Sequence, residues 1–266
     1  MILLLVVGAL LVQDIGWQPA TPRQGSLIVV SSPDALTGEV AGEPLHFRRG
    51  KALAAVPLGA TDSARVRTLS IRWDGAVMGT TAYMPVALRK APVDEQVRAD
   101  ERFTPPPDSA LRERIDRERT LSREAARRAH EVPRLWHASF IRPRTARITS
   151  VFGSGRKVNG VWNTRHAGLD IAGRKGDPVR ASNRGVVALV EDFFYGGKSV
   201  YVYHGDGIMT VYYHLSRALV AVGDTVERGQ IIARVGATGR VTGPHLHWGA
   251  QYGSIAFDPA DLLKLR

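Results

Sequence analysis

The segment "VTGPHLHWGA", residues 241–250, places two histidines one residue apart between glycines and apolar residues. In an extended strand, residues i and i+2 point to the same face, so the side chains of His245 and His247 are expected to lie side by side. Paired imidazoles can bind a metal ion or move a proton. They can also simply hydrogen-bond to their surroundings, so this pair predicts a site only together with other groups.

A second segment, "RHAGLDIAG" at residues 165–173, supplies a histidine and a carboxylate four residues apart. In an extended conformation, His166, Gly168 and Asp170 share one face. The glycine then leaves a gap between the imidazole and the carboxylate, and a metal ion could fill this gap. A histidine and an aspartate at this spacing also occur often by chance, so this motif needs the same support.

A third segment, "VYYHLS", ends an aromatic and β-branched strand at His214. Strand alternation places His214 beside Tyr212 and on the face opposite Tyr213. Taken alone, a histidine at a strand end is usually satisfied by a backbone group.

Together the three segments predict a catalytic metal site. Zinc in such sites takes three protein ligands and keeps one position open, and two histidines with one carboxylate serve hydrolysis. His166, Asp170 and one histidine of the 245/247 pair make this set, and a chain without cysteine has no thiolate to offer instead. The two remaining histidines supply what peptide hydrolysis needs beside a metal: a group that accepts the proton of water, and a group that stabilises the oxyanion or protonates the leaving amine.

These motifs resemble the lysostaphin and LytM type of zinc metallopeptidases, which cut peptide bonds in peptidoglycan. The resemblance runs from about Arg142 to Leu263 and follows the family's order of motifs, through "ITSVFGSGRKVNG", "RHAGLDIAGRKGDPV", "GIMTVYYHLS" and "VGDTVERGQIIARVGATGRVTGPHLHWG". It implies a compact antiparallel β domain that holds one zinc ion per chain at the floor of a groove.

The resemblance also implies a role for each residue of the site. His166, Asp170 and His247 match the zinc ligands of the family. His214 and His245 match its paired catalytic histidines, and which of them acts as the base stays open.

One position departs from the family. Several relatives carry a tyrosine shortly before the first ligand, where this chain has "NGVWNTRH" with Trp162, Asn163 and Arg165. Asn163 or Arg165 is the candidate replacement as a hydrogen-bond donor.

The resulting prediction is a zinc metalloendopeptidase that hydrolyses peptide bonds in peptidoglycan stem peptides or cross-links. Two alternatives stay open. One is a wall-binding activator of other murein hydrolases that uses the same fold without catalysis, which the complete set of matching residues disfavours. The other is an exported protease for ordinary protein substrates.

The charge balance of the chain favours anionic partners. The chain has 36 Lys and Arg against 25 Asp and Glu, a formal net charge of +11. This excess favours peptidoglycan together with an anionic wall or membrane surface as partners. Nucleic acid is not expected, because the basic residues are scattered and no recognition motif is present.

The N-terminus predicts export to the periplasm or cell envelope. The apolar run Ile2–Val12 has eleven residues, which suits a signal peptide and is short of the ~20 that span a bilayer. No Lys or Arg precedes this run and no clear cleavage site follows it, so a buried first strand is the alternative.

The predicted fold class is mainly β. Residues 1–25 form the signal-like segment and a tail, and residues 26–89 form a small antiparallel, immunoglobulin-like β domain with a hairpin turn at Asp74-Gly75. Residues 137–266 form the metallopeptidase domain, with tight hairpins at Gly196-Gly197 and Asp206-Gly207.

Residues 90–136 are predicted to be a charged helical linker, solvated and docked along one side. Asp108 or Ser109 is the expected N-cap. The helix carries a thin apolar stripe of Leu111, Ile115, Ala125, Ala129 and Val132. His130 on this helix and His46 in the first domain are not expected to have a function.

Overall fold

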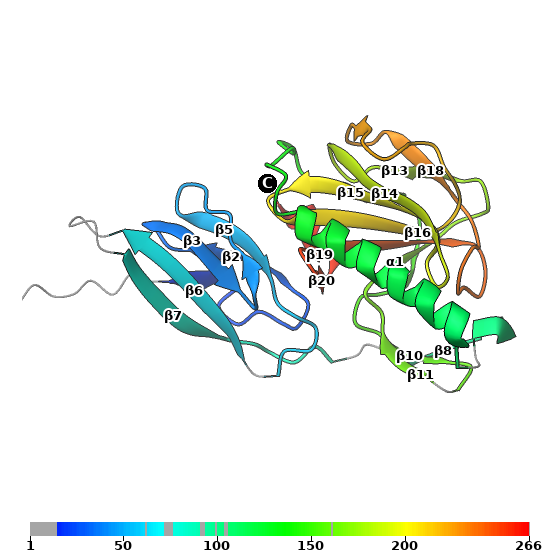
Figure 1. The fold of residues 1–266 in the computed structure, drawn as a ribbon, viewed down its shortest axis with the longest axis horizontal. Helices are drawn as coiled ribbons and strands as arrows, with labels where there is room; N and C mark the ends of the chain where they lie inside the picture. The colour runs from blue at the N-terminus through cyan, green and yellow to red at the C-terminus, as the bar shows by residue number, and fades with distance from the viewer. Residues whose placement is uncertain are drawn as a thin grey trace, which may run out of the picture.

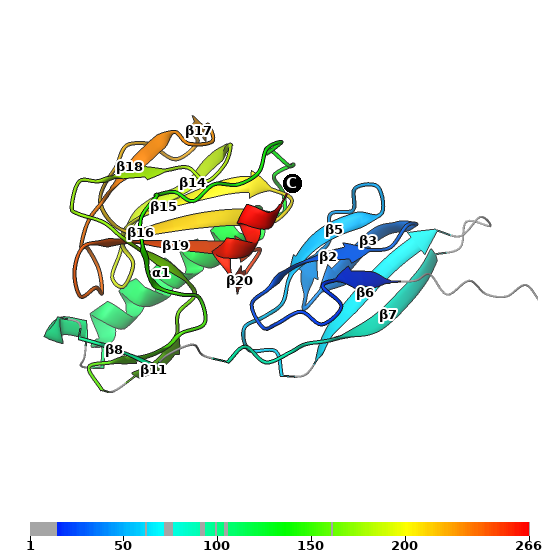
Figure 2. The ribbon, with the colours of Figure 1, turned by 180° about the vertical axis from the view of Figure 1, so that it is seen from behind.

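The computed structural model describes residues 15–61, 63–71, 77–90, 94–98, 100–103, 106–160 and 162–265. The predicted signal-like run and the predicted turn at Asp74-Gly75 lie outside these residues. The chain is mainly antiparallel β, as predicted, in an N-terminal and a larger C-terminal part (Figures 1 and 2). Within the described residues, no helix has the length and apolar character that a membrane span requires.

The N-terminal part consists of two antiparallel sheets with the strand orders β1-β2-β5 and β4-β3-β6-β7. Their strands are β1 (Gly16–Gln18), β2 (Leu27–Ser31), β3 (Ala35–Val40), β4 (Glu43–Pro44), β5 (Lys51–Ala55), β6 (Ser63–Ile71) and β7 (Val77–Pro85). Buried residues such as Ile28, Val30 and Val66 belong to the main core. Since β1 pairs with β2, ordered β structure begins inside the segment predicted as a tail. The immunoglobulin-like topology stays a prediction.

The segment predicted as a helical linker contains a strand as well as a helix. β8 (Asp94–Val97) pairs in parallel with β10 (Gly155–Val158), which pairs in turn with β11 (Trp162–Arg165). A short 3₁₀ turn, η1 (Glu101–Phe103), precedes α1 (Ser109–Arg128), the single α-helix among the described residues. The prediction missed β8 because a four-residue strand in a charged segment has too little apolar pattern to detect.

Helix α1 covers the outer face of the C-terminal sheet (Figure 1). The side chain of Asp108 caps its first turn by accepting a hydrogen bond from Leu111 N at 2.8 Å. The alanines near its C-terminal end pack on side chains from three strands: Phe193, Tyr201, Tyr203, Met209 and Val211. The predicted docking of the helix along one side is thereby confirmed at Ala125 and Ala129 of the apolar stripe, where small alanines allow close packing on the aromatic face of a sheet.

The C-terminal part is one large sheet with the order β17-β14-β15-β16-β19-β12-β9, to which β13, β18 and β20 add further pairings. Its strands are β9 (Ile148–Ser150), β12 (Gly168–Ala172), β13 (Pro178–Arg180), β14 (Gly185–Phe193), β15 (Gly197–Gly205), β16 (Ile208–Ala218), β17 (Thr225–Val226), β18 (Ile231–Val235), β19 (His245–Tyr252) and β20 (Ile255–Phe257), followed by the 3₁₀ helix η2 (Pro259–Lys264). Asp206 and Gly207 join β15 to β16 with positive φ angles of 50° and 80°, as the predicted tight hairpin requires.

Polar contacts join the N-terminal part to the end of the C-terminal sheet. Arg48 and Arg134 both form ion pairs with Asp206, at 2.8 and 3.0 Å. His46 Nε2 lies 2.9 Å from His130 Nδ1, and His130 Nε2 lies 2.8 Å from a carboxylate oxygen of Glu43. No function was predicted for His46 or His130, and the structure places both, partly buried, in this interface.

One buried histidine of the core is expected to make the stability of the fold depend on pH. His204 is fully buried, with Nδ1 2.8 Å from Arg184 O and Nε2 2.8 Å from Thr210 Oγ1. Burial lowers the pKa of His204 to about 4, whereas the unfolded residue titrates near ~6.5. Below that pH, the unfolded state therefore takes up a proton that the folded state refuses. The free energy of unfolding is expected to fall by ~1.4 kcal/mol for each unit by which the pH drops between ~6.5 and about 4.

Urea unfolding at pH 7, 6 and 5 tests this expectation. A His204→Gln variant should lose this part of the pH slope, although it starts from a lower stability. The same slope in wild type and variant would contradict the assignment to His204.

Candidate metal centre

The register of two neighbouring strands builds the site. In the β12–β19 pair, Asp170 lies directly opposite His247, and Ala172 lies opposite His245. Since residues i and i+2 of a strand share a face, both histidines of the pair point to the same face as Asp170. The prediction that His245 and His247 lie side by side is thereby confirmed.

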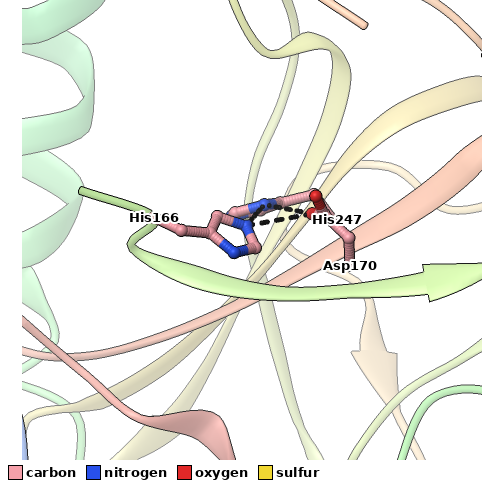
Figure 3. A group of neighbouring side chains, drawn as sticks. All are labelled: His166, Asp170 and His247. Carbon is pink, nitrogen blue, oxygen red and sulfur yellow. Dashed lines mark hydrogen bonds and ion pairs between the residues drawn. The ribbon is translucent and has the colours of Figure 1, made fainter. Parts of the chain in front are cut away.

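His166 joins this pair from the bend between β11 and β12. His166 Nε2 lies 2.9 Å from His247 Nδ1 and 3.0 Å from Asp170 Oδ1, and His247 Nδ1 lies 2.9 Å from the same oxygen. Figure 3 shows the three side chains pointing toward one another. All three are buried. The structure thus brings together the residues that were predicted as metal ligands.

The gap predicted at Gly168 is not a metal position. A Cβ atom at Gly168 would lie 2.6 Å from Nε2 of His247 and 2.6 Å from the carbonyl oxygen of Trp248. The ring of His247 therefore fills the space that the missing side chain leaves. The prediction assumed that residues 166–170 form one extended strand, but His166 lies before β12 begins. The face at Gly168 is occupied by His247 of the neighbouring strand β19 and not by an ion.

A serine and a backbone carbonyl orient His166. Its Nδ1 lies 2.9 Å from Ser150 Oγ and 3.1 Å from the carbonyl oxygen of Val151. Because a carbonyl oxygen only accepts hydrogen bonds, Nδ1 carries the proton, and the lone pair of Nε2 faces Asp170 and His247. Arg156 donates to both Ser150 Oγ and the Asp170 carboxylate, so one guanidinium holds two sides of the cluster.

The protonation states suit a cation. Burial lowers the pKa of His247 to about 4, so its imidazole is neutral at neutral pH. Burial opposes the ionisation of Asp170, but its contacts with His166 and His247 outweigh it and hold the pKa of this carboxyl well below its usual range. Two imidazole nitrogens and a carboxylate oxygen then converge on one point, and a metal ion is the natural partner of such a group of ligand atoms.

His214 reaches the site through an irregular backbone. The pairing of β15 with β16 shifts register near this residue, and His214 has a φ of 63°. This left-handed conformation turns its ring to within 4.9 Å of the ring of His245 and 6.0 Å of that of His247, measured between centroids. Strand alternation placed His214 beside Tyr212, and that prediction was wrong because alternation ends where a strand bulges.

Backbone carbonyls also fix the tautomers of the two histidines beside the cluster. His214 Nδ1 lies 2.9 Å from Thr238 O, and His245 Nδ1 lies 2.8 Å from Gly243 O. Each ring therefore presents an unprotonated Nε2, and that of His245 lies 3.7 Å from Asp170 Oδ1. Burial, together with the neighbouring His245 and His247, keeps the pKa of His214 well below its usual range, so this ring is a neutral proton acceptor at neutral pH.

Reasoning from the sequence missed the groups that support the site. The ring of Tyr213 stacks on His247, with centroids 5.2 Å apart and an angle of 11° between the planes. Its hydroxyl lies 2.7 Å from that of Tyr201, which lies 3.1 Å from Ser122 Oγ on α1. The alternation of "YVYHG" and "VYYHL" on adjacent strands was the available signal for the tyrosine pair. No signal in the sequence linked the helix to it.

Arg165, suggested from the resemblance as a hydrogen-bond donor of the site, has its described partners elsewhere. Its guanidinium bonds to the carbonyl oxygen of Arg89 at 3.0 Å and contacts Gln24, both near the N-terminal part. The side chains of Trp162 and Asn163 lie outside the described part of the structure, so the suggestion of Asn163 as a donor stays a prediction.

An antiparallel β domain that carries a His-Asp-His cluster with two further histidines beside it has the architecture of a metallopeptidase. Residues 164–259 match the model of peptidase family M23. The chain therefore contains a peptidase M23 domain, of the LytM-type metallopeptidases.

Curated relatives match part of the chain. The peptidoglycan DD-endopeptidase ShyA of Vibrio cholerae is 49% identical over 83 residues, which are 31% of this chain and 19% of the relative. The DD-carboxypeptidase/endopeptidase Mpg of Neisseria meningitidis is 38% identical over 117 residues, 44% of this chain and 27% of the relative. The chain thus spans about a fifth to a quarter of the length of these relatives.

A solved structure matches both parts of the chain. A crystal structure of a protein from Pseudomonas aeruginosa assigned to peptidase M23 is 27% identical and has a TM-score of 0.69. The match covers 91% of this chain and 94% of that one. The likeness therefore includes the N-terminal sheets as well as the domain that carries the metal centre.

Proposed function

We propose that this protein is a zinc-dependent endopeptidase that hydrolyses peptide bonds in the stem peptides or cross-links of peptidoglycan. The observation that carries the proposal is the convergence of His166, Asp170 and His247 beside His214 and His245. The names of the curated relatives supply the substrate class, and these matches cover 31% and 44% of the chain.

His166 Nε2, Asp170 Oδ1 and His247 Nδ1 would hold the metal. Their mutual distances of 2.9 to 3.0 Å are close to the ~3.3 Å that separates tetrahedral ligands at ~2.05 Å from zinc. A bound zinc ion supplies Lewis-acid chemistry, polarising the scissile carbonyl and making water a nucleophile at neutral pH.

The two remaining histidines handle the protons. Each presents an unprotonated Nε2 to the same cleft, held by a carbonyl oxygen at its Nδ1. One accepts the proton of the attacking water, and it or its neighbour returns a proton to the leaving amine. Once protonated, such a ring also donates to the developing oxyanion. A non-catalytic activator would need neither histidine.

Export to the periplasm or cell envelope belongs to the same proposal, because peptidoglycan lies outside the cytoplasm. The formal net charge of +11 suits an anionic wall or membrane surface, a second partner that we propose. Fractionation of cells into cytoplasm and envelope, followed by immunoblotting, tests this location.

Digestion of two substrates by the zinc-loaded protein tests the activity. We expect release of soluble dye-labelled fragments, glycan strands freed from their peptide cross-links, from labelled sacculi and little digestion of casein. Release of dye would be absent for a wall-binding activator, and efficient digestion of casein alone would identify an ordinary protease.

Ser150→Ala is expected to weaken metal binding without removing a ligand. The substitution deletes one hydrogen-bond partner of His166 Nδ1 and one of Arg156. Loss of such a partner typically lowers metal affinity by ~10 to 100-fold. Competition with a chelating dye measures the dissociation constant, and Ser216→Ala serves as the control because Ser216 Oγ bonds only to Arg234 O among the described contacts. Equal affinity in both variants would contradict the orienting role.

A further inference from the structure

The cleft beside the metal centre is strongly basic. Its volume is about 550 Å³, and the charged residues on its walls are Arg147, Arg156, Arg240 and Asp170. The only carboxylate among these is already bound by Arg156 and by the histidines of the cluster. Arg147 and Arg240 are therefore not neutralised by Asp170.

Arg240 is the more unusual of these cations. It is partly buried, and its guanidinium carbon lies 4.7 Å from the centroid of the Tyr195 ring. Its backbone N–H also bonds to the carbonyl oxygen of Tyr195 at 2.9 Å, which holds the loop in place. In the part of the chain that the structure describes, no hydrogen bond or ion pair engages the guanidinium itself.

The surroundings of Arg240 disfavour its positive charge. Burial and the positive charge of Arg156 lower the pKa of its guanidinium, which nevertheless stays protonated at neutral pH. Stacking on the face of an aromatic ring leaves the N–H groups at the edge of the guanidinium plane free to donate. Arg240 is thus a partly buried cation with free N–H donors, in a cleft that contains other arginines. Such a group is suited to bind an anionic group of a ligand.

We propose that Arg240, assisted by Arg147, binds a carboxylate of the substrate, so that the cleft selects acidic peptides over neutral ones. This inference rests on the proposed function, because the carboxylate belongs to the peptide that is cleaved. Planar, bidentate donation by arginine suits a carboxylate.

Two synthetic peptides test the subsite. Both contain the same cleavable cross-link, one with free carboxylates on the residues next to it and the other with carboxamides. The zinc-loaded wild type is expected to cleave the carboxylate peptide with a kcat/KM ~10 to 100-fold higher than the amide peptide, as charged hydrogen bonds predict. Arg240→Gln should remove most of this preference, mainly through KM, because the carboxylate is bound in both ground and transition states.

Arg240→Gln should retain the zinc content and should lower cleavage of the carboxylate peptide far more than cleavage of the amide peptide, a selective effect that a merely structural role would not produce. Arg117→Gln, on the exposed face of α1, removes the same charge elsewhere and should keep the full preference. Equal cleavage of both peptides by the wild type, or an undiminished preference in Arg240→Gln, would overturn the subsite and leave the proposed function standing. Failure of the wild type to cleave either peptide would contradict the proposed function itself, and the subsite with it.

Discussion

Replacing Asp170 with asparagine is expected to remove the bound zinc and to lower peptide hydrolysis by ~10³-fold or more, about 4 kcal/mol in the activation free energy. Asp170 supplies the only carboxylate oxygen of the cluster, and that oxygen lies 2.9 and 3.0 Å from the two imidazole nitrogens. A neutral amide of the same size binds zinc poorly and leaves Arg156 without its charged partner. Elemental analysis of the dialysed protein and a hydrolysis assay measure the two effects.

Asp192→Asn is the matched control, since this exposed residue of β14 makes the same chemical change far from the cluster. Its zinc content and rate should equal those of the wild type. An Asp170→Asn protein that folds, retains one zinc ion and hydrolyses at the wild-type rate would contradict the assigned ligand set.

His214→Ala and His245→Ala are each expected to lower kcat by ~10² to 10⁴-fold while zinc stays bound. Both rings present an unprotonated Nε2 to the cleft, and neither supplies an atom of the three-residue cluster. Loss of either ring therefore removes a proton carrier rather than a ligand. Steady-state kinetics and zinc analysis on the same samples separate these two roles.

His137→Ala, at an exposed position, provides the control for loss of an imidazole. The variant with the larger loss at neutral pH identifies the general base, which neither the sequence nor the resemblance decides. Loss of zinc from His214→Ala or His245→Ala would show that a predicted proton carrier is a ligand instead.

Part of the site could be predicted because strand geometry is local. The spacing of His245 and His247 implies a shared face in any strand, and β19 is a strand. That Asp170 on β12 lies opposite His247 depends on the order of strands in the sheet, and a single sequence does not show this order. The resemblance to a family supplied it instead.

Other parts could not be read from local patterns. The left-handed φ of His214 reverses the face that alternation predicts, and nothing in "VYYHLS" marks a bulge. Gly168 is required because the ring of His247, 79 positions later in the chain, fills the space beside it. The sequence around Gly168 suggested a metal ion in that space instead. The hydrogen bond between His46 and His130 likewise depends on how the two parts of the chain pack.

The most direct test of the central claim is mass spectrometry of the products that the zinc-loaded protein forms from a defined, peptide-cross-linked muropeptide dimer. We predict two monomers whose summed mass exceeds that of the dimer by one water, with every glycosidic bond intact, and no products after removal of the metal. An unchanged dimer in the presence of zinc, or products that arise from cleavage of the sugar chain, would contradict the account.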